Sequence, residues 1–180
     1  YQLAMNQAIG LGVLDDQMAA IRDLNRNLEF RKAIKHAIDG KAFAKAMSKG
    51  PFVSVYAGGI ARDSAFFDAD ATSFFPYNPA GANALLDGLG LTDTDGNGIR
   101  NLANGGGDLV INLVQNKDSE NEKLIGDGLA TMMAEVGIKL NLKPMEDTEP
   151  TRQSGEWDWA ISRAQQEFAF PNSGYWSEMG

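Results

Sequence analysis

The stretch Tyr77–Arg100, YNPAGANALLDGLGLTDTDGNGIR, holds the most specific local pattern in the chain. Asn78 is a favoured N-cap, and Pro79 suits the first helical position because the amide hydrogen that it lacks would have no partner there. Apolar residues then recur at helical spacing, at Ala82, Leu85, Leu86 and Leu89. Residues 92–98 are rich in Asp, Asn and Gly and predict a turn. The stretch therefore predicts a short capped helix that leads into an Asx-rich turn.

In the rest of the chain, segments with the hydrophobic period of strands alternate with segments that have the period of helices. Strands are expected within residues 1–7, 108–114, 138–142 and 157–163. Helices are expected at 15–25, at 28–39 after an Asn27 cap, at 41–47, and after a capping box formed by Ser119 and Glu122. Strand, helix and strand within residues 108–142 form a βαβ unit, whose two strands pair in parallel. The predicted fold class is therefore α/β, with a mixed sheet flanked by helices.

The order of these motifs resembles that of the family 5 extracellular solute-binding proteins, the receptors of peptide, nickel and related ABC importers. Besides the stretch 77–100, LEFRKAIKHAID at 28–39 is similar to the family's Phe-Arg-x-Ala-Ile-x-x-Ala-Ile-Asp helix. Residues 124–142 are similar to its helix that leads into Val-Gly-Ile-Lys-Leu, and WDWAIS at 157–162 is similar to its Tyr/Phe-Asp strand. The resemblance covers most of residues 1–170 and implies a lobe of the periplasmic-binding-protein type.

The resemblance also implies a domain organisation. The 180 residues fit one domain. In the family, a strand that ends in Asn, here Asn6, opens the C-terminal lobe, and the chain continues beyond the position of Gly180. We therefore expect residues 1–180 to be most of the C-terminal lobe of a two-lobed receptor, with the N-terminal lobe and the C-terminal return segment missing. A periplasmic or other extracytoplasmic location is implied, with the signal peptide outside this sequence.

Composition excludes several functional classes. With 24 acidic and 16 basic side chains the net charge is −8, which argues against nucleic acid as a partner. The absence of cysteine excludes disulfides and thiolate metal sites. His36 is the only histidine, lies beside lysine in the sequence and is expected to be solvated. Since no Gly-x-Ser-x-Gly elbow accompanies it, neither a hydrolase nor any other enzyme is expected, and no cofactor is implied.

The Asx-rich turn leaves one alternative open. Asp93, Asp95, Asn97 and Gly98 match the first half of a calcium loop, in which oxygens at positions 1, 3 and 5 bind the ion. The second half does not match, because Arg100 takes position 8 and Asn104 takes position 12, where a bidentate Glu is expected. We expect a turn without a metal ion. The alternative is an acidic, calcium-stabilised module of a larger surface protein.

The candidate ligand-binding residues follow the last predicted strand and are Arg163, Gln165, Gln166 and Glu167. Ligands of open α/β folds bind beyond the ends of strands. The resemblance implies that Glu167 takes the place of an acid that pairs with the amino terminus of a bound peptide. The family's frequent Gly-Trp before that acid is here Arg163-Ala164, which removes a tryptophan and adds a cation. The alternative interpretation is a set of surface polar residues after an edge strand.

The function implied is that of a monomeric extracytoplasmic receptor with two lobes that close around a small solute. The solute would be an oligopeptide or another small polar molecule, which the receptor hands to an ABC permease at the membrane. Because both lobes determine specificity, opine or sugar-like solutes and metal chelates also remain possible.

Overall fold

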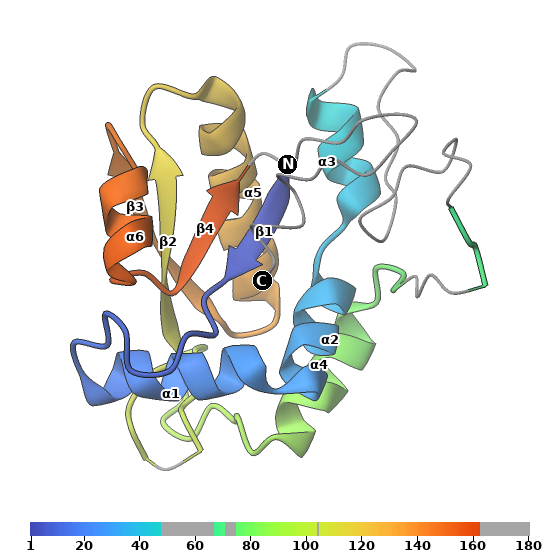
Figure 1. Ribbon diagram of the computed structural model, residues 1–180. Coiled ribbons are helices and arrows are strands. Elements are labelled where there is room, and N and C mark those ends of the chain that lie inside the picture. Colours follow the sequence, from blue (N-terminus) through green and yellow to red (C-terminus); the bar gives the residue numbers. More distant parts are fainter. Residues whose placement is uncertain (48–66, 71–74, 104, 163–180) are drawn as a thin grey trace.

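The computed structural model describes residues 1–47, 67–70, 75–103 and 105–162. In chain order the elements are β1 (Gln2–Met5), α1 (Asp16–Arg26), α2 (Leu28–Ala37), α3 (Gly40–Met47), α4 (Pro79–Gly88), β2 (Val110–Asn116), α5 (Glu120–Glu135), β3 (Lys139–Met145), α6 (Glu149–Ser154) and β4 (Trp159–Ser162). Figure 1 shows a sheet with α5 behind it and α1, α2 and α4 grouped at one end. The α/β class and every predicted strand and helix are confirmed, with boundaries shifted by a few residues.

The strands of the described part form one mixed sheet in the order β1-β4-β2-β3. β2 pairs in parallel with β3, which it reaches through α5, so the predicted βαβ pairing is confirmed. β2 also pairs in parallel with β4, whereas β1 pairs antiparallel with β4. The carboxyl ends of β2, β3 and β4 therefore lie at the same edge of the sheet as the start of β1.

Side chains before the helices account for where the helices begin. The Asn27 side chain accepts hydrogen bonds from the Glu29 and Phe30 amides at the start of α2. The Asn78 side chain accepts one from the Gly81 amide at the start of α4. Each cap satisfies amide groups that have no partner inside the helix, so these short helices begin at fixed residues.

The capping box predicted for α5 forms only in part. Ser119 Oγ accepts a hydrogen bond from the Glu122 amide at 3.3 Å. Glu122 Oε2, however, accepts one at 2.7 Å from the amide of Asn116, at the end of β2, and the Ser119 amide donates to the Asn116 carbonyl. The Glu122 carboxylate thus joins the first turn of α5 to the end of β2. This contact between two elements was not predicted by the local motif.

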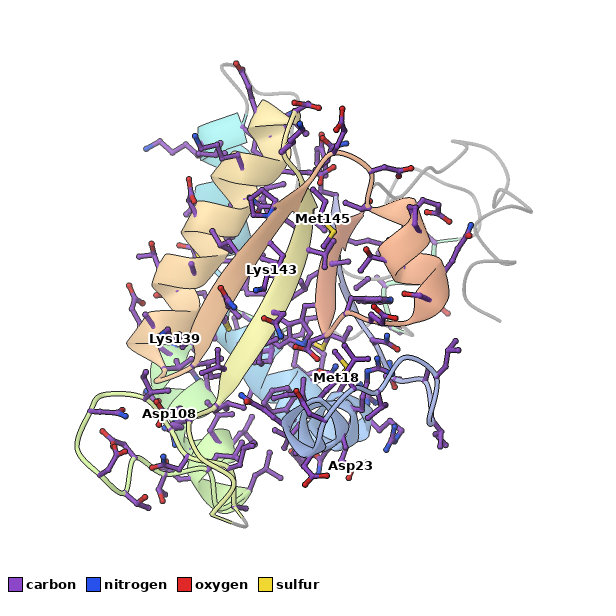
Figure 2. All side chains as sticks on the ribbon, turned by 90° about the vertical axis from the view of Figure 1, so that its left-hand side faces the viewer. Met18, Asp23, Asp108, Lys139, Lys143 and Met145 are labelled. Carbon is purple, nitrogen blue, oxygen red and sulfur yellow. The ribbon has the colours of Figure 1, made fainter. Side chains whose placement is uncertain are left out.

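The core lies between the sheet and the helices α2, α4 and α5. Trp159 of β4 is fully buried, with its ring centroid 6.4 Å from that of Phe30 on α2. The other large apolar side chains that are fully buried in the described part are Ile21, Ile34, Leu86, Leu91, Leu109, Ile111, Leu113, Met133 and Ile138. Figure 2 shows the sheet from the side of β3, with α5 on one face and α6 on the other. Lys139 and Lys143 lie along this outer strand, where charged side chains disfavour pairing with another chain.

His36 does not have the fully solvated environment that we expected. Its side chain is partly buried, and its Nδ1 lies 2.8 Å from the Pro76 carbonyl oxygen. The Phe75 ring also packs against the imidazole, nearly perpendicular to it, with 5.5 Å between the two ring centroids. The segment before α4 covers this side of α2, a long-range contact that helical periodicity does not report.

Candidate functional site

The candidate site lies at the end of the sheet where the carboxyl ends of β2, β3 and β4 meet. We call this end of the sheet the carboxyl edge. β2 ends there at Asn116, β4 ends there at Ser162, and Gln2 of β1 pairs with Ser162. In Figure 1 this edge lies at the top, where the arrowheads of β2 and β4 point and where α5 begins. Loops that leave the carboxyl ends of strands are the usual ligand-binding segments of open α/β folds.

The predicted ligand-binding residues Arg163, Gln165, Gln166 and Glu167 lie outside the described residues. The structure therefore tests neither their positions nor their contacts. It does place Ser162, the residue before Arg163, at the carboxyl edge.

Two further polar residues meet at this edge. The Tyr1 hydroxyl accepts a hydrogen bond from Asn121 Nδ2 at 3.3 Å, which joins the start of β1 to the first turn of α5. Tyr1 is 44% exposed. Sequence reasoning did not select either residue, because the contact joins positions 120 residues apart in the chain.

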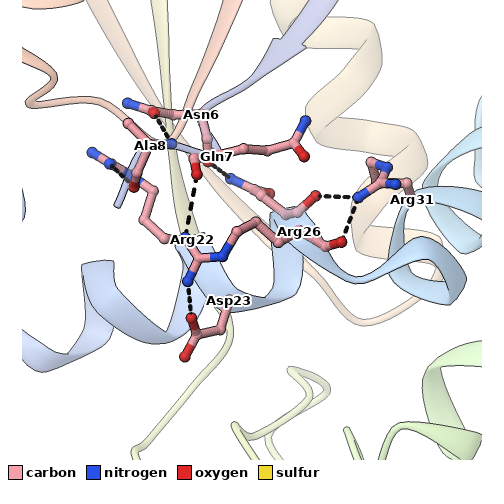
Figure 3. A network of polar contacts seen from close by, with 8 residues as sticks. Asn6, Gln7, Ala8, Arg22, Asp23, Arg26 and Arg31 are labelled. Carbon is pink, nitrogen blue, oxygen red and sulfur yellow. Dashed lines mark hydrogen bonds and ion pairs between the residues drawn. The ribbon is translucent and has the colours of Figure 1, made fainter. Parts of the chain in front are cut away.

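A buried polar cluster occupies the opposite end of the sheet and is formed by Asn6, Arg22, Asn25 and Asp158. Arg22 donates from Nη1 to the Ala8 and Leu11 carbonyls, both at 3.1 Å. Its Nη2 donates to the Gly155 carbonyl. Figure 3 shows Arg22 with Asn6, Ala8 and the neighbouring Arg26. One side chain thereby holds the segment after β1 against the segment before β4.

Asn25 completes this connection. Its Nδ2 donates to the Asn6 carbonyl at 2.9 Å, and its Oδ1 accepts from the Trp159 indole at 2.8 Å. Arg22 and Asn25 fall on the same helical face as the apolar residues Met18 and Ile21. A charge on the apolar face of a helix needs a partner, so the place of Arg22 on this face is a signal in the sequence for a buried polar role.

Asp158 is the acidic member of the cluster and is 1% exposed. Its Oδ2 accepts hydrogen bonds from both the amide and the side chain of Asn112 on β2, each at 2.9 Å. Burial raises the pKa of Asp158 above its usual value, and the hydrogen bonds from Asn112 and the charge of Arg22 offset part of that rise. These contacts hold β4 beside β2 and identify the carboxylate as a structural group.

Two glycines let the same segments approach closely. Gly12 and Gly155 have φ angles of +66° and +80°. A Cβ atom on Gly12 would lie 2.3 Å from the Gly155 carbonyl carbon, a distance that no side chain tolerates. Glycine is therefore required at both positions by conformation and by space.

The Asx-rich turn at 92–98 satisfies its carboxylates with backbone amides. Asp93 accepts hydrogen bonds from the Gly98 amide at 2.8 Å and the Gly96 amide at 2.7 Å, and these bonds lower its pKa. Asn97 Nδ2 donates to Asp108 at 3.1 Å. Among the described residues, no group of three or more His, Cys, Asp or Glu side chains is arranged to hold a metal ion. Asn104 lies outside the described residues.

Arg100, at position 8 of the calcium-loop pattern, has a structural role. It is 9% exposed and donates from Nε to the Val136 carbonyl at 2.7 Å. It also donates to Asp87 at 2.6 Å and to Asn83 at 2.8 Å, both on α4. The side chain therefore ties the turn to α4 and to the end of α5.

Comparisons with known proteins identify the family. The family model "Bacterial extracellular solute-binding proteins, family 5 Middle" matches residues 1–178. The periplasmic alpha-galactoside-binding protein of Rhizobium meliloti (strain 1021) is 37% identical over 175 residues, which are 94% of this chain and 25% of that protein. No helix in the described ranges has the length and apolar character needed to cross a membrane.

Solved structures agree with this assignment. The periplasmic binding protein MelB of Agrobacterium fabrum C58, solved in complex with stachyose, superposes with a TM-score of 0.86 and 35% identity over 92% of this chain and 26% of that one. The oligopeptide-binding protein OppA superposes with a TM-score of 0.75 over 91% of this chain and 25% of that one, at 19% identity, and shares the fold. The chain thus spans about a quarter of the length of these relatives. It belongs to the family 5 bacterial extracellular solute-binding proteins.

Proposed function

We propose that residues 1–180 are most of the C-terminal lobe of an extracytoplasmic receptor that captures a galactose-containing oligosaccharide and hands it to an ABC permease. The observation that carries the proposal is the pair of relatives above 30% identity over more than nine-tenths of this chain. One is named for binding alpha-galactosides, and the other was solved in complex with stachyose.

This proposal replaces the oligopeptide that the sequence led us to expect. The oligopeptide-binding structures resemble this chain at about 20% identity, which supports the fold and not the ligand. The peptide expectation otherwise depended on Glu167, which lies outside the described residues. Arg163-Ala164, where peptide receptors frequently carry Gly-Trp, also favours a different ligand.

The residue types proposed for the site suit an uncharged polyhydroxyl ligand. Arg163 supplies only hydrogen-bond donors, Glu167 supplies only acceptors, and Gln165 and Gln166 supply both. Sugar hydroxyls donate and accept, so each of these side chains can bind one without a compensating ligand charge. We retain the four residues as the proposed site.

The proposed mechanism is closure of two lobes around the solute. In binding proteins of this kind, lobes move as bodies about short connecting segments and exclude water from the ligand. The buried polar cluster around Arg22 joins the ends of two strands within this lobe. Such internal ties support movement of the lobe as one unit, with its carboxyl edge turned toward the solute.

The test uses the intact receptor that contains this segment, purified without added ligand. Its melting temperature and calorimetric affinity would be measured with stachyose, with maltotetraose as a sugar that lacks galactose, and with trialanine. We expect stachyose to bind and to raise the melting temperature by mass action, and the other two to have no effect. Binding of trialanine without binding of stachyose would return the assignment to peptides.

The calcium-stabilised alternative has a separate test. The Asp93 oxygens that would bind the ion already accept amide hydrogens from Gly96 and Gly98. We therefore expect calcium at millimolar excess over a chelator to leave the melting temperature unchanged. A rise that follows calcium concentration would show that the turn binds the ion.

A further inference from the structure

We infer that Asn97 is a site of spontaneous deamidation, and that hydrogen bonds to Asp93 and Asp108 restrain the reaction in the folded protein. The Asx-rich turn at 92–98 has no part in the proposed function, and the residues that carry the inference all lie within the described ranges.

The sequence places the two reacting groups next to each other. Asn97 is followed by Gly98, and both residues are exposed. In deamidation, the backbone nitrogen of the following residue attacks the side-chain carbonyl carbon Cγ of asparagine. Glycine has no Cβ to obstruct this approach, and its backbone rotates more freely than that of any other residue. The chain has a second such pair, Asn104-Gly105, whose asparagine lies outside the described residues.

The reaction needs no reagent other than water. The Gly98 nitrogen loses its proton and forms a bond to Asn97 Cγ. The bond from Cγ to Nδ2 breaks, and the amide nitrogen takes up a proton and leaves as ammonia. The succinimide ring that remains is opened by water at either carbonyl, which gives aspartate or isoaspartate at position 97.

The folded turn holds the attacking nitrogen. The Gly98 amide donates to Asp93 Oδ2 at 2.8 Å, while Asp93 Oδ1 accepts from the Gly96 amide at 2.7 Å. These bonds, that from Gly98 foremost, lower the pKa of Asp93, so the carboxylate is a weak base. It binds the amide hydrogen of Gly98 without removing it, and the nitrogen is a nucleophile only after that hydrogen is lost.

Hydrogen bonds also hold the group that would be attacked. Asn97 Oδ1 accepts from the Ile99 amide at 2.7 Å. Its Nδ2 donates to Asp95 Oδ2 at 3.2 Å and to Asp108 Oδ1 at 3.1 Å. Asp108, which is labelled in Figure 2 just before β2, also accepts from Asn101 Nδ2 at 3.2 Å. Because Cγ must turn onto the following nitrogen and lose Nδ2, these bonds have to break before the reaction.

Deamidation should therefore proceed through the fraction of molecules in which the turn is open. The product replaces a donor with a carboxylate, which can only accept hydrogen bonds. This carboxylate would face Asp95 and Asp108, two groups of like charge. The modified residue cannot form the bonds of Asn97 again, so the modification would release the turn from the start of β2.

The experiment follows conversion at Asn97 in the intact receptor during incubation at mildly alkaline pH. Trypsin cleaves after Arg100, so Asn97 and Asn104 fall in different peptides, and mass spectrometry measures the conversion of each one. We expect Asn97 to convert at least about tenfold faster in the parent unfolded by guanidinium than in the folded parent, because the open turn is a minor state of the folded protein.

Two variants test the hydrogen bonds separately. Asp93→Ala frees the Gly98 amide, and Asp108→Ala frees the Asn97 side chain. Each is expected to speed conversion at Asn97 at least about threefold in the folded receptor. Asp127→Ala, which removes an exposed carboxylate from α5, is the control and should leave the rate unchanged. Circular dichroism establishes that the variants are folded, and Asp108→Ala decides the matter if Asp93→Ala is not.

Three results would overturn the inference. Conversion at Asn97 that is as fast in the folded parent as in the unfolded one would show that the hydrogen bonds provide no restraint. A lack of conversion even in the unfolded receptor would show that Asn97 is not a deamidation site. Rates in the folded Asp93→Ala and Asp108→Ala variants equal to that of the parent would remove the role of these carboxylates. The assay contains no sugar, so none of these results bears on the proposed function.

Discussion

Arg22 is a buried cation whose hydrogen-bond partners are mostly backbone carbonyls. It is 1% exposed and donates to the carbonyls of Ala8, Leu11 and Gly155. Burial lowers the pKa of Arg22, and the opposite charge of the nearby Asp158 offsets part of that lowering. A planar group with five donors can reach the carbonyls of two chain segments at once, and a lysine ammonium, with three donors at one point, cannot match this geometry.

Replacing Arg22 should therefore destabilise the protein strongly. Arg22→Met keeps the apolar length but leaves several buried carbonyls without donors, so we expect the free energy of unfolding to fall by about 3 kcal/mol. Urea unfolding followed by circular dichroism measures the change. Arg26→Ala on the same helix is the control, since its ion pair with Asp23 is largely exposed and is worth about 0.5 kcal/mol. Equal effects of the two variants would show that the Arg22 contacts are dispensable.

Asp158 should make stability depend on pH in the direction opposite to that of an ordinary salt-bridged acid. Its pKa is raised in the folded state, so between the unfolded pKa of about 4 and the raised value the native state holds more protons than the unfolded state. Stability from this group is therefore fully present below the unfolded pKa and is lost as pH rises through the folded pKa. Asp158→Asn removes the titration.

The measurement is urea unfolding of the parent and of Asp158→Asn at several pH values from about 4 to 7. The stability of the parent relative to the variant should decline as pH rises. An increase with pH would mean that the attraction of Arg22 and the bonds from Asn112 exceed the cost of burial, so that the carboxylate is stabilised in its charged form.

At the scale of elements, the end of α5 depends on one glycine. The Ile138 amide donates to the Met133 carbonyl and the Gly137 amide donates to the Ala134 carbonyl, the bond pair of a Schellman motif. Gly137 has φ of +75°, and a Cβ there would lie 2.9 Å from Arg100 Cγ. Arg100 cannot move aside easily, since its guanidinium is hydrogen-bonded to α4 and to Val136.

Gly137→Ala is accordingly expected to cost about 1 to 3 kcal/mol of stability. Gly88→Ala is the matched comparison, because Gly88 ends α4 without a positive φ and a Cβ there meets no atom within 4 Å. That substitution should stabilise the protein by about 0.5 kcal/mol through lower entropy of the unfolded chain. Thermal unfolding of both variants checks the pair, and a neutral result at Gly137 would contradict the account of this helix end.

Local signals predicted the elements well where the cause was itself local. Asn27, Asn78 and Ser119 cap the helices that the sequence assigned to them. Prediction failed where a partner came from a distant segment. Glu122 binds the end of β2 instead of completing its capping box, and His36 is covered by the residues before α4.

The location of the candidate site could be predicted from the sequence, but the side-chain contacts that form it could not. The parallel pairing of β2 with β3 follows from the strand-helix-strand pattern, so the end of the sheet at which their carboxyl ends meet could be predicted from the sequence. The contact between Tyr1 and Asn121 could not be predicted, since it depends on how β1 and α5 meet in space. The roles of Arg163, Gln165, Gln166 and Glu167 stay predictions, because these residues lie outside the described ranges.

At the scale of the whole molecule, the two ends of the sheet differ in chemistry. Asn6, Arg22 and Asp158 are buried at one end, where their hydrogen bonds join the turns that connect the strands. The carboxyl edge at the other end carries the partly exposed Tyr1 and the strand that leads to Arg163. Under the proposed function, these two ends suit a lobe that moves as one body and shares its ligand with a second lobe.

The 180-residue chain alone should therefore bind stachyose at least about a hundredfold more weakly than the intact receptor. Binding clefts bury most of the ligand surface, and one lobe leaves the opposite face of the sugar in water, with its contacts to the second lobe missing. A hundredfold loss corresponds to about 2.7 kcal/mol, a small share of what a buried oligosaccharide face contributes. Calorimetry on both proteins makes the comparison, with circular dichroism to establish that the shorter chain is folded. Comparable affinities would place the whole site within residues 1–180 and would remove the reason for invoking closure of two lobes.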